Sequence, residues 1–156
     1  MILKRILLRF WKLLPNSLGL RRLLVWLVSQ KFLVGIVGIV LNEDNEILLL
    51  EHSYRKEYPW GLPGGWLTKG EQPTSALKRE IREETGYGID IVRPVEQYAD
   101  QSYARLDLIY LCRIRGGTFT SSDEIISAAF YPEDDLPLLI PHQISLIHAA
   151  LEQINI

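Results

Sequence analysis

The chain of 156 residues contains one cysteine, Cys112. A single thiol excludes an intrachain disulfide framework and a zinc site built from cysteines. We therefore expect a reducing compartment, the cytoplasm, for this protein. Cys112 lies in the apolar run LDLIYLCRI, and we interpret it as a core thiol.

Long apolar runs are also missing. Arg9, Lys12, Arg21 and Arg22 interrupt every window of about 20 residues near the N-terminus, which is the length a helix needs to cross a bilayer. The basic residues run through the apolar stretch instead of preceding it, unlike the pattern of a signal peptide. Neither a membrane span nor a signal peptide is therefore expected.

Acidic residues are absent from residues 1–31, which hold seven basic side chains: Lys4, Arg5, Arg9, Lys12, Arg21, Arg22 and Lys31. The remaining 125 residues carry ten basic and 19 acidic side chains, a net charge of −9. An acidic body of this kind argues against nucleic acid as its partner. The charge change divides the chain into an extension, 1–31, and a domain, 32–156.

The extension begins with an amphipathic pattern over residues 1–14, with basic residues on one arc and apolar residues opposite. Pro15 then breaks the pattern, and a second apolar and basic stretch follows. Three interpretations stay open for this helical extension. It can pack on the domain or on a second subunit of a homodimer. It can lie on an anionic membrane surface, peripheral to the inner face, through residues 1–28. It can also bind RNA.

The pattern of apolar and polar residues changes at residue 32. Residues 32–42 and 47–52 are expected to form two strands joined by a polar turn, Asn42–Asn45. A loop rich in glycine and proline leads to a helix over 74–85, which Gly86 is placed to cap. Further strands are expected at 89–98, 105–115 and 126–131, and a closing helix at 141–153. This order predicts an α+β fold with a helical appendage.

The most informative segment runs GGWLTKGEQPTSALKREIREETGY from Gly64 to Tyr87. Glu80, Glu83 and Glu84 stand at i, i+3 and i+4, so a helix presents all three carboxylates on one face. Such like charges repel by roughly 0.2–0.5 kcal/mol per pair. Their retention indicates a neutralising cation, and oxygen-only ligands favour Mg²⁺, with Mn²⁺ as an alternative.

This segment resembles the Nudix box. The matching positions are Gly65, Glu71, Arg79, Glu80, Ile81, Glu83, Glu84 and Gly86. Tyr87 departs from the pattern, because an aliphatic residue is usual there. The resemblance covers residues 32–153 and implies a Nudix-type α/β/α sandwich with a mixed sheet.

The resemblance also implies roles for these residues. Glu80, Glu83 and Glu84 would hold the metal, together with a carbonyl oxygen of Gly64 or Gly65. Arg79 would orient a box glutamate through a salt bridge, and Glu71 would position the loop. The general base stays open between Glu84, Glu83 and Glu124, which precedes a predicted strand.

Substrate selection is expected outside the box. Tyr58, Trp60 and Trp66 flank the glycine loop and can stack on a base, and Arg55 can meet a terminal phosphate. By family resemblance, Ser102 and Tyr103 lean away from ADP-ribose and toward a polyphosphate. We interpret His52, His142 and His148 as structural.

The sequence therefore predicts a Mg²⁺-dependent pyrophosphohydrolase of a nucleoside diphosphate linked to another moiety. That class includes nucleoside triphosphates, dinucleoside polyphosphates and nucleotide sugars. The alternative is a catalytically idle domain of the same family, acting as a nucleotide sensor or an interaction module.

Overall fold

The computed structural model describes residues 18–100 and 103–152. The expected helix over residues 1–14 lies outside that range. The chain forms two compact units, residues 1–31 and 32–156, which we describe separately. In the first unit, helix α2 (Leu18–Val28) has exposed apolar side chains, among them Leu23, Trp26 and Leu27. No helix among the described residues is long and apolar enough to cross a membrane.

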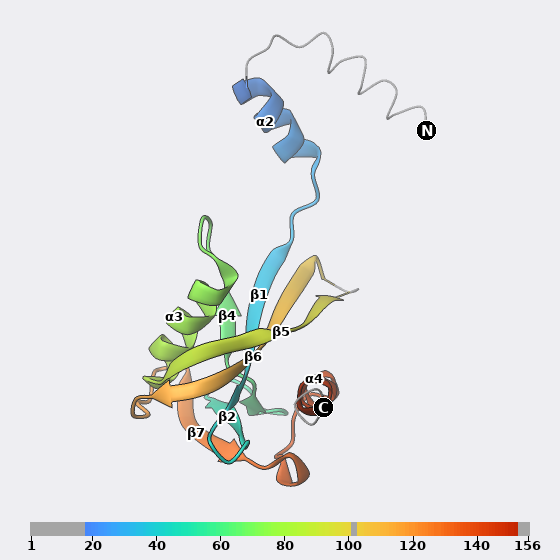
Figure 1. Cartoon of the computed structure of the whole chain (residues 1–156). Helices are drawn as coiled ribbons and strands as arrows, with labels where there is room; N and C mark the ends of the chain where they lie inside the picture. The colour runs from blue at the N-terminus through green and yellow to red at the C-terminus, as the bar shows by residue number, and fades with distance from the viewer. Residues whose placement is uncertain (1–17, 101–102, 153–156) are drawn as a thin grey trace. The chain divides into compact units, whose positions relative to one another are not determined.

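The second unit is built on a seven-stranded mixed sheet (Figure 1). Its strands are β1 (Leu33–Leu41), β2 (Ile47–His52), β3 (Trp60–Gly61), β4 (Gly64–Trp66), β5 (Gly88–Asp100), β6 (Arg105–Gly116) and β7 (Ile125–Tyr131). The order β3-β2-β1-β6-β5 forms the main path, β4 pairs with β1, and β7 pairs with β2. The β1–β6 pair is parallel, while the other pairs are antiparallel.

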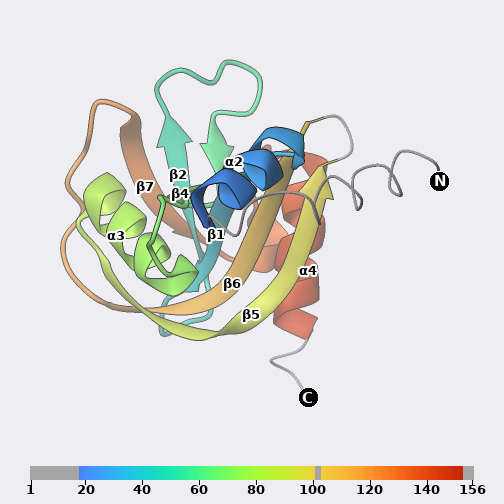
Figure 2. The same ribbon diagram turned by 90° about the horizontal axis from the view of Figure 1, so that it is seen from above.

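Two helices cover the sheet on opposite sides, as Figure 2 shows for α3 (Pro73–Thr85) and α4 (Pro141–Glu152). Alternate β1 residues serve the two sides, as expected for a strand buried on both faces. Ile36 and Val40 pack in the cluster that contains α3, while Ile39 and Leu41 pack in the cluster that contains α4. A short 3₁₀ helix, η1 (Glu133–Asp135), precedes α4. The predicted α+β sandwich is confirmed.

The box helix begins and ends close to its expected bounds. Pro73 occupies its first turn, where the missing N–H is tolerated. Gly86 ends it with φ of 77°, a left-handed conformation that glycine adopts without strain, and donates its N–H to the Arg82 carbonyl. The turn before β2 also forms as expected, with Asn45 at φ of 64°.

The glycine-rich segment differs from the expectation of a loop, because it contains the short strands β3 and β4. β4 pairs with β1 from Gly35 to Val37, whereas β2 meets β1 only where Leu41 pairs with Ile47. The two neighbours of β1 therefore diverge, and the candidate site lies where they separate.

Candidate active site

A pocket of about 370 Å³ lies at this divergence. Its wall comes from β1, the end of β2 with the loop after it, the β3–β4 connection, β4, α3, the start of β6, α4 and the loop before β7. Acidic side chains from α3 and from that loop share the pocket with basic side chains from two other segments. The arrangement suits a ligand that carries negative charge and reaches the protein partly through a cation.

Three carboxylates line the pocket: Glu80, Glu84 and Glu124. The first two lie one helical turn apart on α3. Glu124 lies far from α3 in the sequence. A backbone hydrogen bond positions it, because its carbonyl accepts the N–H of Ser53 at 2.9 Å. A Cβ built on Gly65 would lie 2.3 Å from Glu80 Cδ, so the Glu80 carboxyl packs directly on the backbone of β4.

Glu84 has the environment expected of a cation ligand. Its Oε2 is buried and has no hydrogen-bond partner within the described part of the chain. Burial, and next the charge of Glu80, raise the pKa of Glu84 to about 7. Glu124 raises the pKa further, while the backbone N–H of Gly64 and the charge of Arg55 oppose the shift. A bound cation would satisfy the unpaired oxygen and the clustered charge together.

The donor set fits a hard divalent cation. Within residues 18–100 and 103–152, no three His, Cys, Asp or Glu side chains are grouped so that they alone could hold a metal ion. Mg²⁺ is usually bound by one or two carboxylates together with waters and substrate phosphates. Glu80 and Glu84, with a carbonyl of Gly64 or Gly65, match that incomplete protein shell.

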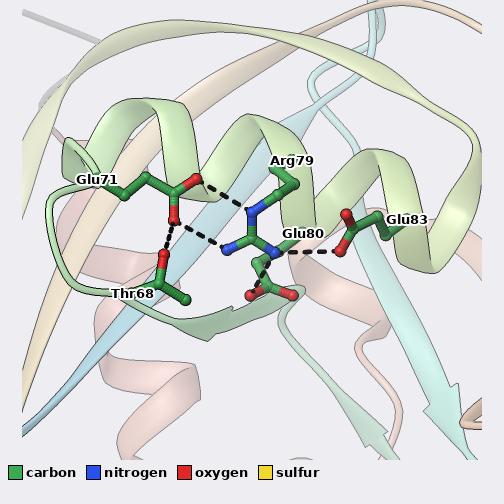
Figure 3. Close-up of polar contacts among 5 residues, drawn as sticks. All are labelled: Thr68, Glu71, Arg79, Glu80 and Glu83. Carbon is green, nitrogen blue, oxygen red and sulfur yellow. Dashed lines mark hydrogen bonds and ion pairs between the residues drawn. The ribbon is translucent and has the colours of Figure 1, made fainter.

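Arg79 forms the centre of a network of polar contacts along α3 (Figure 3). Its Nε and Nη2 donate to the two Glu71 oxygens, both at 3.0 Å, and Nη1 lies 3.0 Å from Glu80 Oε1. Glu71 Oε2 also accepts from the Thr68 hydroxyl at 2.7 Å. Hydrogen bonds from Arg79, and then from Thr68, lower the pKa of Glu71 to about 2. The network joins the loop to the helix and holds one oxygen of Glu80.

Glu83 belongs to this network and does not line the pocket. Its Oε2 accepts from Arg79 Nη1 at 3.1 Å, and its side chain is 60 % exposed. Helical spacing brings Glu83 to the face of Glu80 and Glu84, but the guanidinium of Arg79 holds it at the solvent side. Of the three box glutamates, the structure brings Glu80 and Glu84 together in the pocket.

The predicted substrate-binding residues divide in the same way. Trp66 and Arg55 line the pocket. Trp60 packs against Tyr131, with ring centroids 5.3 Å apart, and contributes to the core on the α4 side. Tyr58 is half-buried outside the pocket lining, and Tyr103 is 74 % exposed and also outside it.

Sequence reasoning missed other residues that line this pocket, including His52, Arg105 and Gln143. Arg105 stacks on Trp66, with its Cζ 4.9 Å from the ring centroid, and pairs with Asp107 at 2.7 Å. Trp66 and the Arg105–Asp107 pair meet because β1 lies between their strands: Gly35 of β1 pairs with Trp66 on one side and with Asp107 on the other. Sequence alone does not reveal which strands are neighbours.

The three histidines have different surroundings. His142 lies 4.0 Å from the Tyr98 ring, centroid to centroid, and His148 Nδ1 contacts Glu133 at 2.7 Å. Both therefore have partners outside the pocket, in keeping with the structural interpretation. His52 lies inside the pocket wall without a hydrogen-bond partner for either ring nitrogen among the described residues.

Comparison with known proteins identifies relatives of this chain. The profile of the NUDIX domain matches residues 31–150. A MutT-like protein of Streptomyces ambofaciens is 27 % identical over 66 % of this chain and 66 % of its own length. An ADP-ribose pyrophosphatase of Methanocaldococcus jannaschii is 31 % identical over 68 % of this chain and 65 % of its own. The chain thus spans about two thirds of the length of these two relatives.

Among solved structures, a UDP-X diphosphatase superposes with a TM-score of 0.71. It is 24 % identical, and the match covers 90 % of this chain and 73 % of the other. At that identity the likeness concerns the fold alone.

Proposed function

Because the chain belongs to the Nudix family, we propose that it is a Mg²⁺-dependent pyrophosphohydrolase. Its substrate would be a nucleoside diphosphate linked to another moiety, cleaved at the phosphoanhydride. The observation that carries this proposal is the buried Glu84 carboxyl, with its unpaired Oε2, beside Glu80 and Glu124 in a pocket that Gly64 and Gly65 also line. An inert protein would gain nothing from holding such a cluster.

The metal ion, when bound, would shield the phosphate charge and make hydroxide available near neutral pH. Glu80 and Glu84 would hold it, and Arg79 would keep Glu80 in position. The missing side chains of Gly64 and Gly65 let β4 pack directly on β1 and on the Glu80 carboxyl, so that the β4 backbone lines the pocket where a phosphate would bind. Glu124 lies in the pocket and is our first candidate for the group that removes a proton from water; Glu84 is the second.

The choice among nucleoside triphosphates, dinucleoside polyphosphates and nucleotide sugars is not decided by the predicted specificity residues. Tyr103, which by family resemblance favoured a polyphosphate as the substrate, lies outside the pocket lining. Trp66 is the aromatic side chain of that predicted set that does line it, and it is 47 % exposed. We expect a base or sugar ring of the substrate to contact Trp66.

The proposal is tested by a panel of these three substrate classes and ADP-ribose, assayed with the full chain and Mg²⁺. We expect release of two phosphorylated fragments from at least one class, and complete loss of that activity on chelation with EDTA. Activity restored by Mg²⁺ or Mn²⁺ but not by Zn²⁺ would match the oxygen ligands. A folded protein that hydrolyses nothing in the panel would favour the idle binding module.

For the extension 1–31 we propose contact with an anionic membrane surface, which would place a cytoplasmic enzyme at the inner face. The support is α2, with exposed Trp26 and Leu27 next to Arg21 and Arg22, and the absence of acidic residues in this unit. Liposome flotation of the full chain is expected to recover protein with anionic vesicles. The double variant W26D/L27D should remain at the bottom. Equal flotation of both would exclude contact through α2, and a dimer in solution would favour the packing interpretation.

A further inference from the structure

The pocket contains, besides the carboxylates, side-chain nitrogens that are buried and unpaired. His52 is 6 % exposed, and neither of its ring nitrogens has a hydrogen-bond partner in the described part of the chain. Arg55 Nη1 is buried and unpaired in the same sense. Such groups cost stability, because they have lost water and gained no protein partner. Their retention in one pocket indicates that a ligand supplies the missing partner.

These groups pack around Gly61 of β3 and line the same pocket. A Cβ built on Gly61 would lie 2.6 Å from Arg55 Nη1, and 3.5 Å from both His52 Nε2 and Gln143 Oε1. Gln143 Oε1 accepts the N–H of Leu62 at 3.3 Å, which fixes the orientation of the amide. Its NH₂ group makes no hydrogen bond with the described residues and is left as a donor.

Arg55 makes no ion pair within the described residues, although its charge acts on Glu84 and opposes the rise in pKa that burial causes there. Glu80, Glu84 and Glu124 share the pocket with Arg55. Its guanidinium lies over the Tyr54 ring, with Cζ 5.8 Å from the ring centroid. A guanidinium held apart from nearby carboxylates is available to an anionic ligand.

His52 is suited to the same ligand. Burial, and then the charge of Arg55, lower its pKa to about 4. The imidazole is therefore neutral near pH 7 and offers one N–H donor without adding charge. Arg55, His52 and the Gln143 amide together provide a cationic and two neutral donors around one space.

We propose that His52, Arg55 and Gln143 form an oxyanion subsite that binds a phosphoryl group of the substrate other than the one nearest the carboxylates. This inference rests on the proposed function, in which the carboxylates bind phosphate through a cation. The subsite would hold the second phosphoryl group and thereby orient the anhydride between itself and the carboxylates. A charged acceptor is favoured over a sugar hydroxyl, because a partly buried guanidinium forms its strongest hydrogen bonds with an anion.

The test measures binding and not turnover, so it stands even if no substrate is hydrolysed. The probe is methylenediphosphonate, whose P–C–P bridge resists hydrolysis, titrated calorimetrically into the full chain with Mg²⁺. We expect R55A to weaken binding by about 10- to 100-fold and H52L by a few-fold. R55K should fall between wild type and R55A, because lysine keeps the charge and loses the planar fork. The control is K56A, which changes an exposed cation next in the chain.

Thermal unfolding without ligand separates this role from a structural one. If His52 supported the fold, H52L would lower Tm; because its polar atoms are unpaired, we expect H52L to leave Tm unchanged or to raise it. Methylenediphosphonate should raise the Tm of wild type and of K56A more than that of R55A. Binding of R55A equal to wild type, an equal loss in K56A, or protection by ribose in place of the diphosphonate would each overturn the subsite.

Discussion

Replacing Glu84 by glutamine is expected to lower kcat by about 10³-fold or more while the domain stays folded. The change removes the buried negative charge that would hold the cation, and it preserves the shape of the side chain. Steady-state hydrolysis of the best substrate of the panel, with Mg²⁺ varied, is the measurement. The matched control is E83Q on the same helix, for which we expect less than a 10-fold loss, because Glu83 is exposed and bound to Arg79.

The same variant should change how stability depends on pH. The pKa of Glu84 is raised from 4.5 to about 7 in the folded protein, so folding favours the protonated form. In EDTA, the stability that the protonated Glu84 carboxyl contributes to the folded protein is fully present below pH 4.5. It is lost as the pH rises to 7. The loss is about 3 kcal/mol at most. Urea unfolding at pH 8 should therefore find E84Q more stable than wild type, and Mg²⁺ should reverse the order. If the difference in unfolding free energy between wild type and E84Q were the same at pH 5 and at pH 8, this prediction would be wrong.

The second large effect is a difference between alanine substitutions at two neighbouring glycines, Gly64 and Gly65. A Cβ on Gly64 would lie 2.2 Å from the carbonyl oxygen of Ile36, which is backbone of β1 and cannot move alone. We expect G64A to push β4 from β1 and to cost several kcal/mol of unfolding free energy. A Cβ on Gly65 would meet the end of the Glu80 side chain, which can rotate away. G65A should stay folded and lose activity by about 10²-fold as Glu80 leaves its position.

Circular dichroism melts and the hydrolysis assay distinguish the two variants. The expected pattern is a large drop in Tm for G64A, and a nearly unchanged Tm with reduced activity and weakened Mg²⁺ dependence for G65A. Serine variants provide a second pair with the same Cβ. A stable and active G64A, or a G65A with wild-type activity, would show that β4 adapts more readily than its contacts with β1 and Glu80 indicate.

The sequence predicted those parts of the fold that depend on local chemistry. The box helix, its glycine cap and the turn near Asn45 follow from residues close in the chain, and the structure has them nearly where expected. β3 and β4 were missed because strands of two and three residues are stabilised by pairing with distant segments and have little periodicity of their own.

The candidate site was predicted to the same extent. Helical spacing correctly placed Glu80 and Glu84 side by side, but the same spacing could not show that Arg79 draws Glu83 to the solvent side. The group of His52, Arg55 and Gln143 could not be foreseen, because residues from β2, the following loop and α4 meet only through the tertiary fold. His52 ends its strand between Glu51 and Ser53, and this local sequence gives no sign that its ring nitrogens are unpaired.

The parallel pairing of β1 with β6 has a consequence for how the protein acquires its site. Leu33 pairs with Arg105, and the register holds to Leu41 with Arg113, so the partners are 72 positions apart. Closing such loops is slow compared with forming helices. On a ribosome, the box helix can form early, whereas Glu124 and Gln143 reach the pocket only after the chain has emerged beyond residue 143. A nascent chain would therefore carry its acidic helix for most of synthesis without the residues that complete the pocket, and activity would appear only with the last helix.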